Sequence, residues 1–322
     1  MKSHSKHIFL IIASLYISSF ISLSFAGSAY ITNQGENTVS VIDTTSNQVL
    51  NTIKVGLKPV GVAVSAINHR AYISNVDGQS ISVIDTTKNK LINTYPIKGS
   101  PVGLVISPDS KTLYVADWTD DRIYLLDAIT LKAQAEIKDG KAPAGMVISA
   151  DGKKLYIANR DTNDVAVIDT TTRQISHRIA VSKHPFGLAL SKNGNELYVV
   201  NVISNSVSVI NTTSLKSETI NVGDHPYCVT PSKDGLFLFV TNTQDDSVSV
   251  IDLAKKQSIA TIKVGEVPEG INTDDLTGNI YVANWASNQV SVIDGQTQKV
   301  ITQIKTGEKS RAFGQFILQT ST

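Results

Sequence analysis

The chain has 322 residues, of which 41% are hydrophobic and 18% are charged, and this composition excludes a disordered chain, a collagen and a heptad rod. Its 29 lysine and arginine residues balance 28 aspartate and glutamate residues, so the formal net charge is +1. A near-neutral chain has no bulk electrostatic attraction to nucleic acid or to an anionic membrane. The single cysteine, Cys228, excludes an internal disulfide and any multi-cysteine metal site.

Residues 1–26 have the features of a secretory signal peptide. Lys2 and Lys6 give a positive N-terminus, a mostly apolar stretch follows, and Ser24–Ala26 form a small-x-small cleavage site. The alternative is a transmembrane anchor, which needs about 20 mainly apolar residues, and the serines that dilute this stretch favour cleavage instead. We therefore expect cleavage after Ala26 and a mature protein that is periplasmic or secreted.

A unit of about 42 residues repeats along the rest of the chain. Each unit opens on an aromatic residue in a segment such as AYITN, LYIAN or IYVAN, and the seven openings are Tyr30, Tyr72, Tyr114, Tyr156, Tyr198, Phe239 and Tyr281. A VSVID-like segment, a more polar segment and a segment beginning Pro-x-Gly follow. These short Val-, Ile- and Tyr-rich segments are typical of strands, four to each unit. Four-stranded antiparallel units at this period predict an all-β propeller with seven blades.

The phase of the repeat predicts how the ring closes. The mature chain begins with the second strand of a unit, from Tyr30, and ends with a first strand, Arg311–Leu318. We expect this last strand to pair with residues 29–33, because an open ring would leave two unpaired sheet edges. Residues 27–318 would then be one propeller domain, followed by a short polar tail at 319–322.

The motifs AYITN, AYISN, LYVAD, LYIAN, LYVVN, LFVTN and IYVAN, each followed by a VSVID-like strand, resemble those of the YVTN-repeat propellers. These are exported seven-bladed rings of bacteria and archaea, and the resemblance covers about residues 29–318. It implies that the Pro-x-Gly strand is the innermost strand of each blade. It also implies envelope proteins and haem, quinone and lactonase-type propellers as relatives, so it does not choose a function.

The innermost strands would converge on the axis, where a side chain crowds its neighbours. This explains the glycines at the third position of the Pro-x-Gly segments, which are Gly61, Gly103, Gly145, Gly187 and Gly270. Cys228 and Ala312 take this position in the other two units. We interpret Cys228 as a small core residue rather than a reactive thiol, because no paired base accompanies it.

The loops on one face of the predicted ring vary from unit to unit, as expected where loops carry specificity. Trp118 and Trp285 share one repeat position, and such a pair either stacks on a ligand or caps its own blades. The remaining candidate binding residues flank the prolines or follow the aromatic strands, and they are Arg160, His184, His225, Phe186, Tyr227, Arg311, Lys58 and Glu269.

Metal and haem sites are not favoured by the residues present. His184 and His225 precede proline in consecutive units and would be neighbours, but zinc and copper sites usually need three or four ligands. The Cys-x-x-Cys-His motif of c-type haem is absent. The acidic loops at 117–121 and 245–246 lack the spaced ligands of a calcium loop. We expect no cofactor and no metal.

We therefore expect a monomeric, non-catalytic propeller that presents its variable loops to a protein, peptide or glycan of the cell envelope, because no catalytic constellation is recognisable. One alternative is nucleic-acid binding by stacking on the tryptophans, Phe186 and Tyr227, which the near-neutral charge disfavours. The other is a lactonase-like or a haem- or quinone-related redox propeller, for which Glu269 with His225 is the one acid–base pair that we can name.

Overall fold

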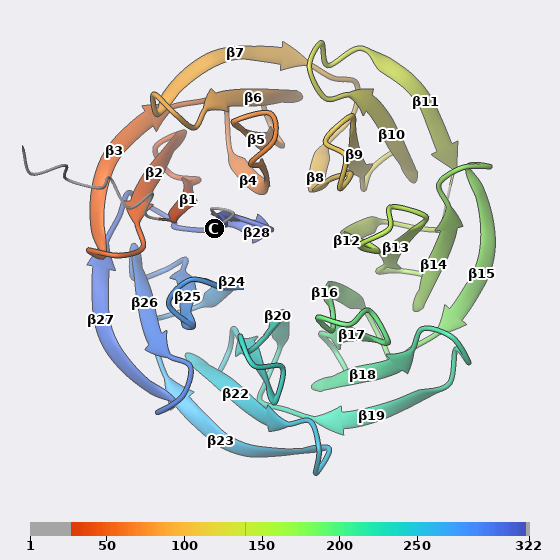
Figure 1. The fold of residues 1–322 in the computed structure, drawn as a ribbon, viewed down its shortest axis with the longest axis vertical. Coiled ribbons are helices and arrows are strands. Elements are labelled where there is room, and N and C mark those ends of the chain that lie inside the picture. The colour runs from red at the N-terminus through yellow and green to blue at the C-terminus, as the bar shows by residue number, and fades with distance from the viewer. Residues whose placement is uncertain (1–26, 139, 320–322) are drawn as a thin grey trace, which may run out of the picture.

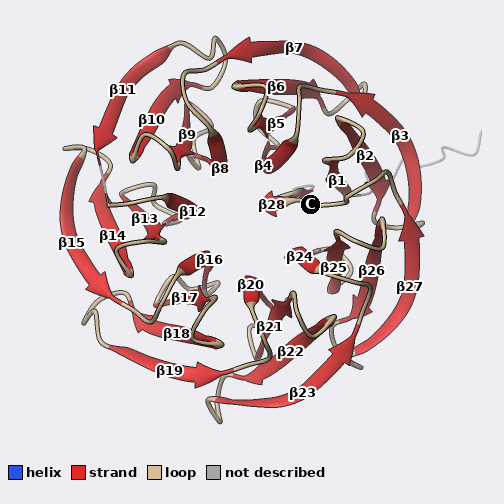
Figure 2. Cartoon of the chain, turned by 180° about the vertical axis from the view of Figure 1, so that it is seen from behind, coloured by secondary structure: helices blue, strands red, loops and turns tan. Residues whose placement is uncertain are grey.

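The computed structural model describes residues 27–138 and 140–319, and the predicted signal peptide lies outside these ranges. The described residues form seven sheets in a ring around a central axis (Figure 1). Seen from behind, the same ring consists of strands and loops without helices (Figure 2). The predicted all-β, seven-bladed propeller is therefore confirmed. Within the described ranges there is no helix of the length and apolarity that membrane crossing requires.

Blade 1 combines the two ends of the chain, and the other six blades follow in sequence order. Blade 1 contains β1 Ser28–Asn33, β2 Thr38–Asp43, β3 Gln48–Lys54 and β29 Ile317–Leu318; blade 2 contains β4 Pro59–Ser65, β5 Arg70–Asn75, β6 Ser80–Asp85 and β7 Lys90–Pro96, joined by β28 Phe313–Gly314; blade 3 contains β8 Pro101–Ile106, β9 Thr112–Asp117, β10 Arg122–Asp127 and β11 Ala133–Lys138. Blade 4 contains β12 Pro143–Ile148, β13 Lys154–Asn159, β14 Asp164–Asp169 and β15 Gln174–Ala180; blade 5 contains β16 Pro185–Leu190, β17 Glu196–Asn201, β18 Ser206–Asn211 and β19 Ser217–Asn221; blade 6 contains β20 Pro226–Pro231, β21 Phe237–Asn242, β22 Ser247–Asp252 and β23 Gln257–Lys263; blade 7 contains β24 Pro268–Thr273, β25 Asn279–Asn284, β26 Gln289–Asp294 and β27 Lys299–Lys305.

The repeated aromatic residues pack between neighbouring blades. Tyr30, Tyr72 and Tyr281 are fully buried. Their hydroxyls reach the next blade, where that of Tyr72 donates to the carbonyl oxygen of Ala128 (2.8 Å) and that of Tyr281 donates to the carbonyl oxygen of Thr44 (2.9 Å). A buried tyrosine keeps its hydroxyl satisfied in this way while the ring fills the space between two sheets. These residues therefore form the core between the blades.

Within most blades, an asparagine joins the strand that opens on the aromatic residue to the VSVID-like strand that follows it. Asn33 Nδ2 donates to Ser40 Oγ (2.9 Å), and both residues are buried. The same bond joins Asn75 to Ser82, Asn201 to Ser208, Asn242 to Ser249 and Asn284 to Ser291. Blade 3 has Asp117 and Tyr124 at these two positions. Because a carboxylate cannot donate, blade 3 does not make this bond.

A second repeated bond links consecutive blades on the face where the inner strands begin at proline, here named the proline face. The side chain of an Asn or Asp accepts the backbone N–H of the residue before the next blade's inner strand. The pairs are Asn37 with Lys58, Asp121 with Ala142, Asn163 with His184, Asn205 with His225, Asp246 with Val267, and Asn288 with Lys309. The junction between blades 2 and 3 has Gln79 at this position, and the Ser100 N–H donates to Asp117 Oδ1 instead (3.1 Å).

The ring closes through the chain ends as predicted, but the closing segment is not one continuous strand. Ile317 pairs with Ala29, the Tyr30 N–H donates to the Phe316 carbonyl (2.9 Å), and the Arg311 N–H donates to the Thr32 carbonyl (2.7 Å). The expectation of one uninterrupted strand over Arg311–Leu318 is therefore wrong, because the residues between these two bonds do not pair with β1.

The interruption follows from an insertion of two residues. Ser310 pairs with Asn33 at the end of β1, and Ile317 pairs with Ala29 near the start of β1. Between these two pairs the closing segment advances seven residues. The inner strand of blade 5 covers the same span in five, Pro185 to Leu190. Residues 312–315 therefore leave β1, and β28 runs parallel to β4 near the centre of the ring (Figure 1). We call residues 312–315 the axial excursion.

Removing the closing segment tests the composite blade. Deletion of residues 311–322 exposes the inner edge of β1 and removes Phe313, Phe316 and Ile317 from the core, so we expect the cooperative thermal transition to disappear. As a control, the deleted segment is placed directly before Gly27, where it and β1 form a hairpin like those of the other blades, and cooperative melting returns. A truncated protein that melts like the complete chain would contradict the closure.

Candidate functional site

The inner strands approach each other closely around the axis. A Cβ atom built on Gly61 would lie 2.1 Å from the Val102 carbonyl oxygen, and one on Gly103 would lie 2.0 Å from the Ala144 carbonyl oxygen. Backbone this close leaves no room for a side chain, because neither neighbour can move without breaking its own sheet. The predicted reason for these glycines is therefore confirmed.

Cys228 takes the glycine position in blade 6. It is buried, and its backbone N–H donates to Thr241 Oγ1 (3.0 Å). Burial raises the pKa of the Cys228 thiol, so the sulfur stays protonated and is a poor nucleophile. This supports a core role for Cys228.

Aromatic side chains fill the channel at the proline face. The ring centroid of Phe186 lies 4.3 Å from that of Tyr227 and 4.9 Å from that of Phe313 in the axial excursion. The ring centroids of Trp118 and Phe186 lie 6.4 Å apart, with the two ring planes nearly perpendicular. Phe186 is only 4% exposed, so its expected role as an open stacking platform is wrong. We call Phe186, Tyr227 and Phe313 the aromatic plug.

An ion pair lies beside the plug. Arg311 Nε pairs with Glu269 Oε2, Arg311 Nη2 donates to the Tyr227 hydroxyl, and the guanidinium stands 5.6 Å from the Tyr227 ring centroid. Burial raises the pKa of Glu269, and the positive charge of Arg311 opposes this shift. The three side chains come from blades 6, 7 and 1, so the pair ties the closing segment to its neighbours.

The predicted acid–base pair of Glu269 with His225 is not formed. Glu269 pairs with Arg311, whereas His225 Nδ1 lies 2.9 Å from Asp224 Oδ1. The two side chains therefore have separate partners. The backbone N–H groups of His184 and His225 belong to the bonds between blades, which gives both loops a structural role.

The structure brings six of the ten predicted site residues into one connected group. The Arg160 guanidinium lies 5.6 Å from the Trp118 ring centroid, and the chain of contacts continues through Phe186, Tyr227 and Arg311 to Glu269. Trp285 lies outside this group. Lys309 Nζ is 4.9 Å from the Trp285 ring centroid, and Trp285 Nε1 donates to Gln34 Oε1 (3.2 Å). Lys58, His184 and His225 also remain outside the connected group and serve the bonds between blades.

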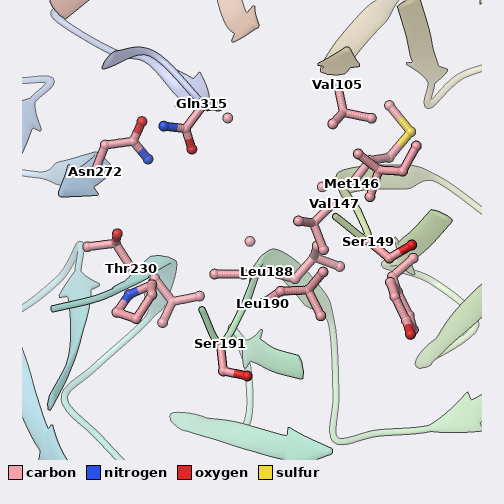
Figure 3. Close-up of a pocket in the computed structure, with 18 of the residues that line it drawn as sticks. Val105, Met146, Val147, Ser149, Leu188, Leu190, Ser191, Thr230, Asn272 and Gln315 are labelled. Atoms are coloured by element: carbon pink, nitrogen blue, oxygen red, sulfur yellow. The ribbon is translucent and has the colours of Figure 1, made fainter. Parts of the chain in front are cut away.

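A large hollow lies on the axis beyond the plug and reaches the face opposite the proline face. It is a cavity of about 730 Å³ between the inner strands β8, β12, β16, β20, β24 and the axial excursion. Aliphatic side chains from β8, β12 and β16, among them Val105, Val147 and Leu188, line one wall (Figure 3). Thr230, Asn272 and Gln315 lie on the other side. Because the aromatic plug fills the proline end, the cavity is blind.

The polar wall is held by its own hydrogen bonds. Asn272 Oδ1 accepts the Phe316 N–H (2.7 Å), and the Thr230 and Thr273 hydroxyls lie 3.0 Å apart. The Gln315 side chain projects from the axial excursion and is exposed to the cavity. At the rim, Lys192 pairs with Asp275 (2.6 Å).

None of the ten predicted site residues lines the cavity. A signal for it is present in the inner strands, which read PVGLVIS, PAGMVIS and PFGLALS in blades 3 to 5 but PYCVTPS and PEGINTD in blades 6 and 7. The change from aliphatic to polar residues after the glycine position corresponds to the two walls. The loops before the prolines vary more visibly from blade to blade, so the sequence pointed to that face instead.

Residues 66–194 match the family model of the Cytochrome D1 heme domain. The matched range includes β8, β12 and β16, which form the aliphatic wall. A PE-PGRS family protein, PE_PGRS18 of Mycobacterium tuberculosis, is 49% identical over 47 residues, which is 15% of this chain and 10% of that protein. This local match carries no further argument.

Solved structures share the fold over most of the chain. Kuenenia stuttgartiensis hydrazine synthase aligns with a TM-score of 0.75 and 21% identity over 82% of this chain and 91% of that chain. A functionally unknown protein from Desulfotomaculum acetoxidans aligns with 0.76 and 15% over 92% and 100%. The dihydro-heme d1 dehydrogenase NirN, in complex with DHE, aligns with 0.67 and 15% over 86% and 63%. At these identities the likeness establishes the fold alone.

The haem-related match raises the question of whether this cavity suits a haem iron. Iron in haem proteins is held by His, Cys, Met or Tyr. No histidine lines the cavity. Met146, Tyr156 and Cys228 do line it, but Met146 is 8% exposed and packs in the core with Leu125, and Cys228 packs with the aromatic plug. Tyr156 is 2% exposed, and burial raises its pKa, so the phenol keeps the proton that it would have to lose to bind iron. The described residues contain no cluster of three His, Cys, Asp or Glu that would hold a metal. The cavity therefore does not fit a protein-ligated haem iron.

Breaking the buried ion pair tests its structural role. We expect Glu269→Gln or Arg311→Met alone to lower the free energy of unfolding by about 3 kcal/mol, because each leaves one buried charge without a partner. The double variant removes both charges and should recover most of that loss, as measured by urea denaturation. Losses that simply add in the double variant would show that the two charges do not interact.

Proposed function

We propose that this chain is an exported propeller of the YVTN-repeat type, cleaved after Ala26, that binds a flat and mostly apolar organic molecule in its axial cavity. The blind cavity carries this proposal. Its volume of about 730 Å³ lies within the range of about 300–1,000 Å³ that is usual for small-molecule sites. Such sites combine apolar walls with a few polar groups that orient the ligand, as the two walls of this cavity do.

A tetrapyrrole is the ligand class that we favour. Its ring faces are flat and apolar, which suits Val147, Leu188 and Leu190, and its polar edge groups would meet Asn272 and Gln315 on the other side. The family match over residues 66–194 supports this class, because the matched segment forms the aliphatic wall. Among the described residues, the possible iron ligands that line the cavity, Met146, Tyr156 and Cys228, are buried in the core, so the proposal concerns binding of the ring and not electron transfer at a metal.

Titration with two porphyrins tests this proposal. We expect metal-free protoporphyrin IX and haem to bind with affinities within about threefold of each other, because the possible iron ligands in the cavity wall are buried in the core. Leu190→Trp fills the cavity and should weaken both by at least about tenfold, whereas Ile203→Trp, on an exposed loop, should change neither. The measurement is the shift of the porphyrin absorbance band.

Two outcomes of that titration would overturn the proposal. If neither porphyrin binds, the cavity has another ligand class. If haem binds more than about a hundredfold tighter than the metal-free ring, a side chain ligates the iron and the cavity is a site for the metal as well as the ring.

A second candidate function is recognition of an envelope protein, peptide or glycan at the proline face. Trp285 favours it, because this half-buried ring is covered by the exposed cation of Lys309 and takes no part in the aromatic plug. An exposed Trp–cation pair can stack on a sugar or a side chain. We expect Trp285→Ala to weaken retention on immobilised native envelope without lowering the melting temperature, whereas Leu190→Trp should leave retention unchanged. The opposite pattern would assign binding to the cavity.

A further inference from the structure

The seven blades allow one blade to be compared with the others, and several departures from the repeat fall at the junction of blades 2 and 3. The third strand has a buried isoleucine near its end in six blades: Ile53, Ile137, Ile179, Ile220, Ile262 and Ile304. Blade 2 has Tyr95 there. The centre of the VSVID-like strand has a small residue in six blades: Ser40, Ser82, Ala166, Ser208, Ser249 and Ser291. Blade 3 has Tyr124 there.

The linker between these two blades is also unusual. After the third strand the other blades have a small residue, which is Gly56, Gly140, Ser182, Gly223, Gly265 or Gly307. Blade 2 has Lys98, preceded by Pro96 at a position where no other blade has proline. This is also the junction where Gln79 replaces the Asn or Asp of the bond between blades.

Four of these unusual residues line one pocket. It has a volume of about 200 Å³ and is bordered by Tyr95, Pro96 and Lys98 from blade 2 and by Tyr124 from blade 3. The rest of the lining is aliphatic and consists of Ile81, Ile97, Leu126, Leu131 and Ala133. Substitutions that are far apart in the sequence therefore converge in space. Packing alone does not require this, because the other blades close the same junction with isoleucine, serine and glycine.

Among the residues that the structure describes, none forms a hydrogen bond with the Tyr124 hydroxyl. Tyr124 is 7% exposed, and Asp117, which replaces the asparagine that serves the other blades, has no N–H to donate. A buried hydroxyl without a partner costs free energy that a bound polar group would recover. Burial raises the pKa of Tyr124, with the charge of Asp117 adding to the shift, so the hydroxyl keeps its proton and can donate.

Charges of both signs lie near the pocket, because the carboxylates of Asp117, Asp120 and Glu136 act on Tyr124 together with the Arg122 guanidinium, and Lys98 stands at the rim. Lys98 is exposed at the rim and forms no ion pair in the part of the chain that the structure describes. The Arg122 guanidinium lies 6.0 Å from the Tyr124 ring centroid, although Glu136 already pairs with it (2.8 Å). Lys98 is therefore the cation left for a ligand.

We propose that this pocket binds a small apolar carboxylate, the size of a single aromatic ring, with its hydrocarbon part between Ile81, Pro96 and Leu126 and its carboxylate near Lys98 and the Tyr124 hydroxyl. A hydroxyl donor and an ammonium together select an anionic acceptor, and the aliphatic lining selects an apolar body. The site is separate from the axial cavity and does not rest on the function proposed for it.

Fluorine NMR with 4-fluorobenzoate tests this site on the complete mature chain. We expect saturable broadening of the probe signal, and binding of the neutral isostere 4-fluorobenzamide at least about fivefold weaker. Lys98→Gly restores the residue found in most other blades, Tyr124→Phe removes only the hydroxyl, and each should weaken 4-fluorobenzoate binding by about tenfold.

Matched variants control for the rest of the molecule. Lys88→Gly removes a lysine from the same blade, Tyr114→Phe removes a hydroxyl from the neighbouring strand, and Leu190→Trp blocks the axial cavity. We expect none of these to change binding. Should Tyr124→Phe melt well below the unsubstituted protein, Lys98→Gly decides the question, because Lys98 is exposed. The proposal is overturned if 4-fluorobenzoate fails to saturate, if the amide binds as tightly, or if Lys98→Gly binds like the unsubstituted chain.

Discussion

The hydrogen bonds between the C-terminal segment and β1 hold the two ends of the chain in one sheet, and the positions of all seven blades depend on that closed ring. Only a few backbone contacts make this joint, among them the Arg311 N–H to Thr32 and the Tyr30 N–H to Phe316. Side chains reinforce it, because the Tyr281 hydroxyl from blade 7 reaches the Thr44 carbonyl of blade 1 and Arg311 pairs with Glu269. A ring with an open joint would expose the inner edge of β1.

The closure also shapes the interior. Two additional residues in the closing segment send the axial excursion across the channel, and Phe313 completes the aromatic plug with Phe186 and Tyr227. The result is a channel that is filled at the proline face and hollow beyond it. One local change in strand length therefore turns an axial channel into a blind cavity, and it places Gln315 in the cavity wall.

Much of the fold could be predicted because it depends on local patterns that occur many times. The aromatic openings, the Pro-x-Gly segments and the phase of the repeat predicted seven blades and a composite first blade, and the glycine contacts on the axis followed from the same repeat. The axial excursion could not be predicted in this way. It occurs once, and its extra length becomes visible only when the pairing with β1 is known.

The candidate sites were harder to predict for a related reason. The repeat placed Phe186 and Glu269 on the proline face correctly, but it could not show that both turn inward, one into the plug and the other toward Arg311. In the sequence, the inner-strand residues Val147 and Asn272 resemble ordinary core positions. They become parts of one site only because strands of different blades face each other across the axis. Tyr95, Lys98 and Tyr124 were visible departures from the repeat, yet their meaning depends on blades 2 and 3 meeting at one pocket.

Native-state hydrogen exchange of two backbone amides tests the ring closure most directly. The Tyr30 and Arg311 amides donate across the joint, and cooperative closure predicts that they exchange only through global unfolding, with the same opening free energy as amides in the middle of β17. If these two amides exchange as fast as exposed loop amides while those of β17 stay protected, the joint opens independently and the account of the ring, the plug and the blind cavity is contradicted.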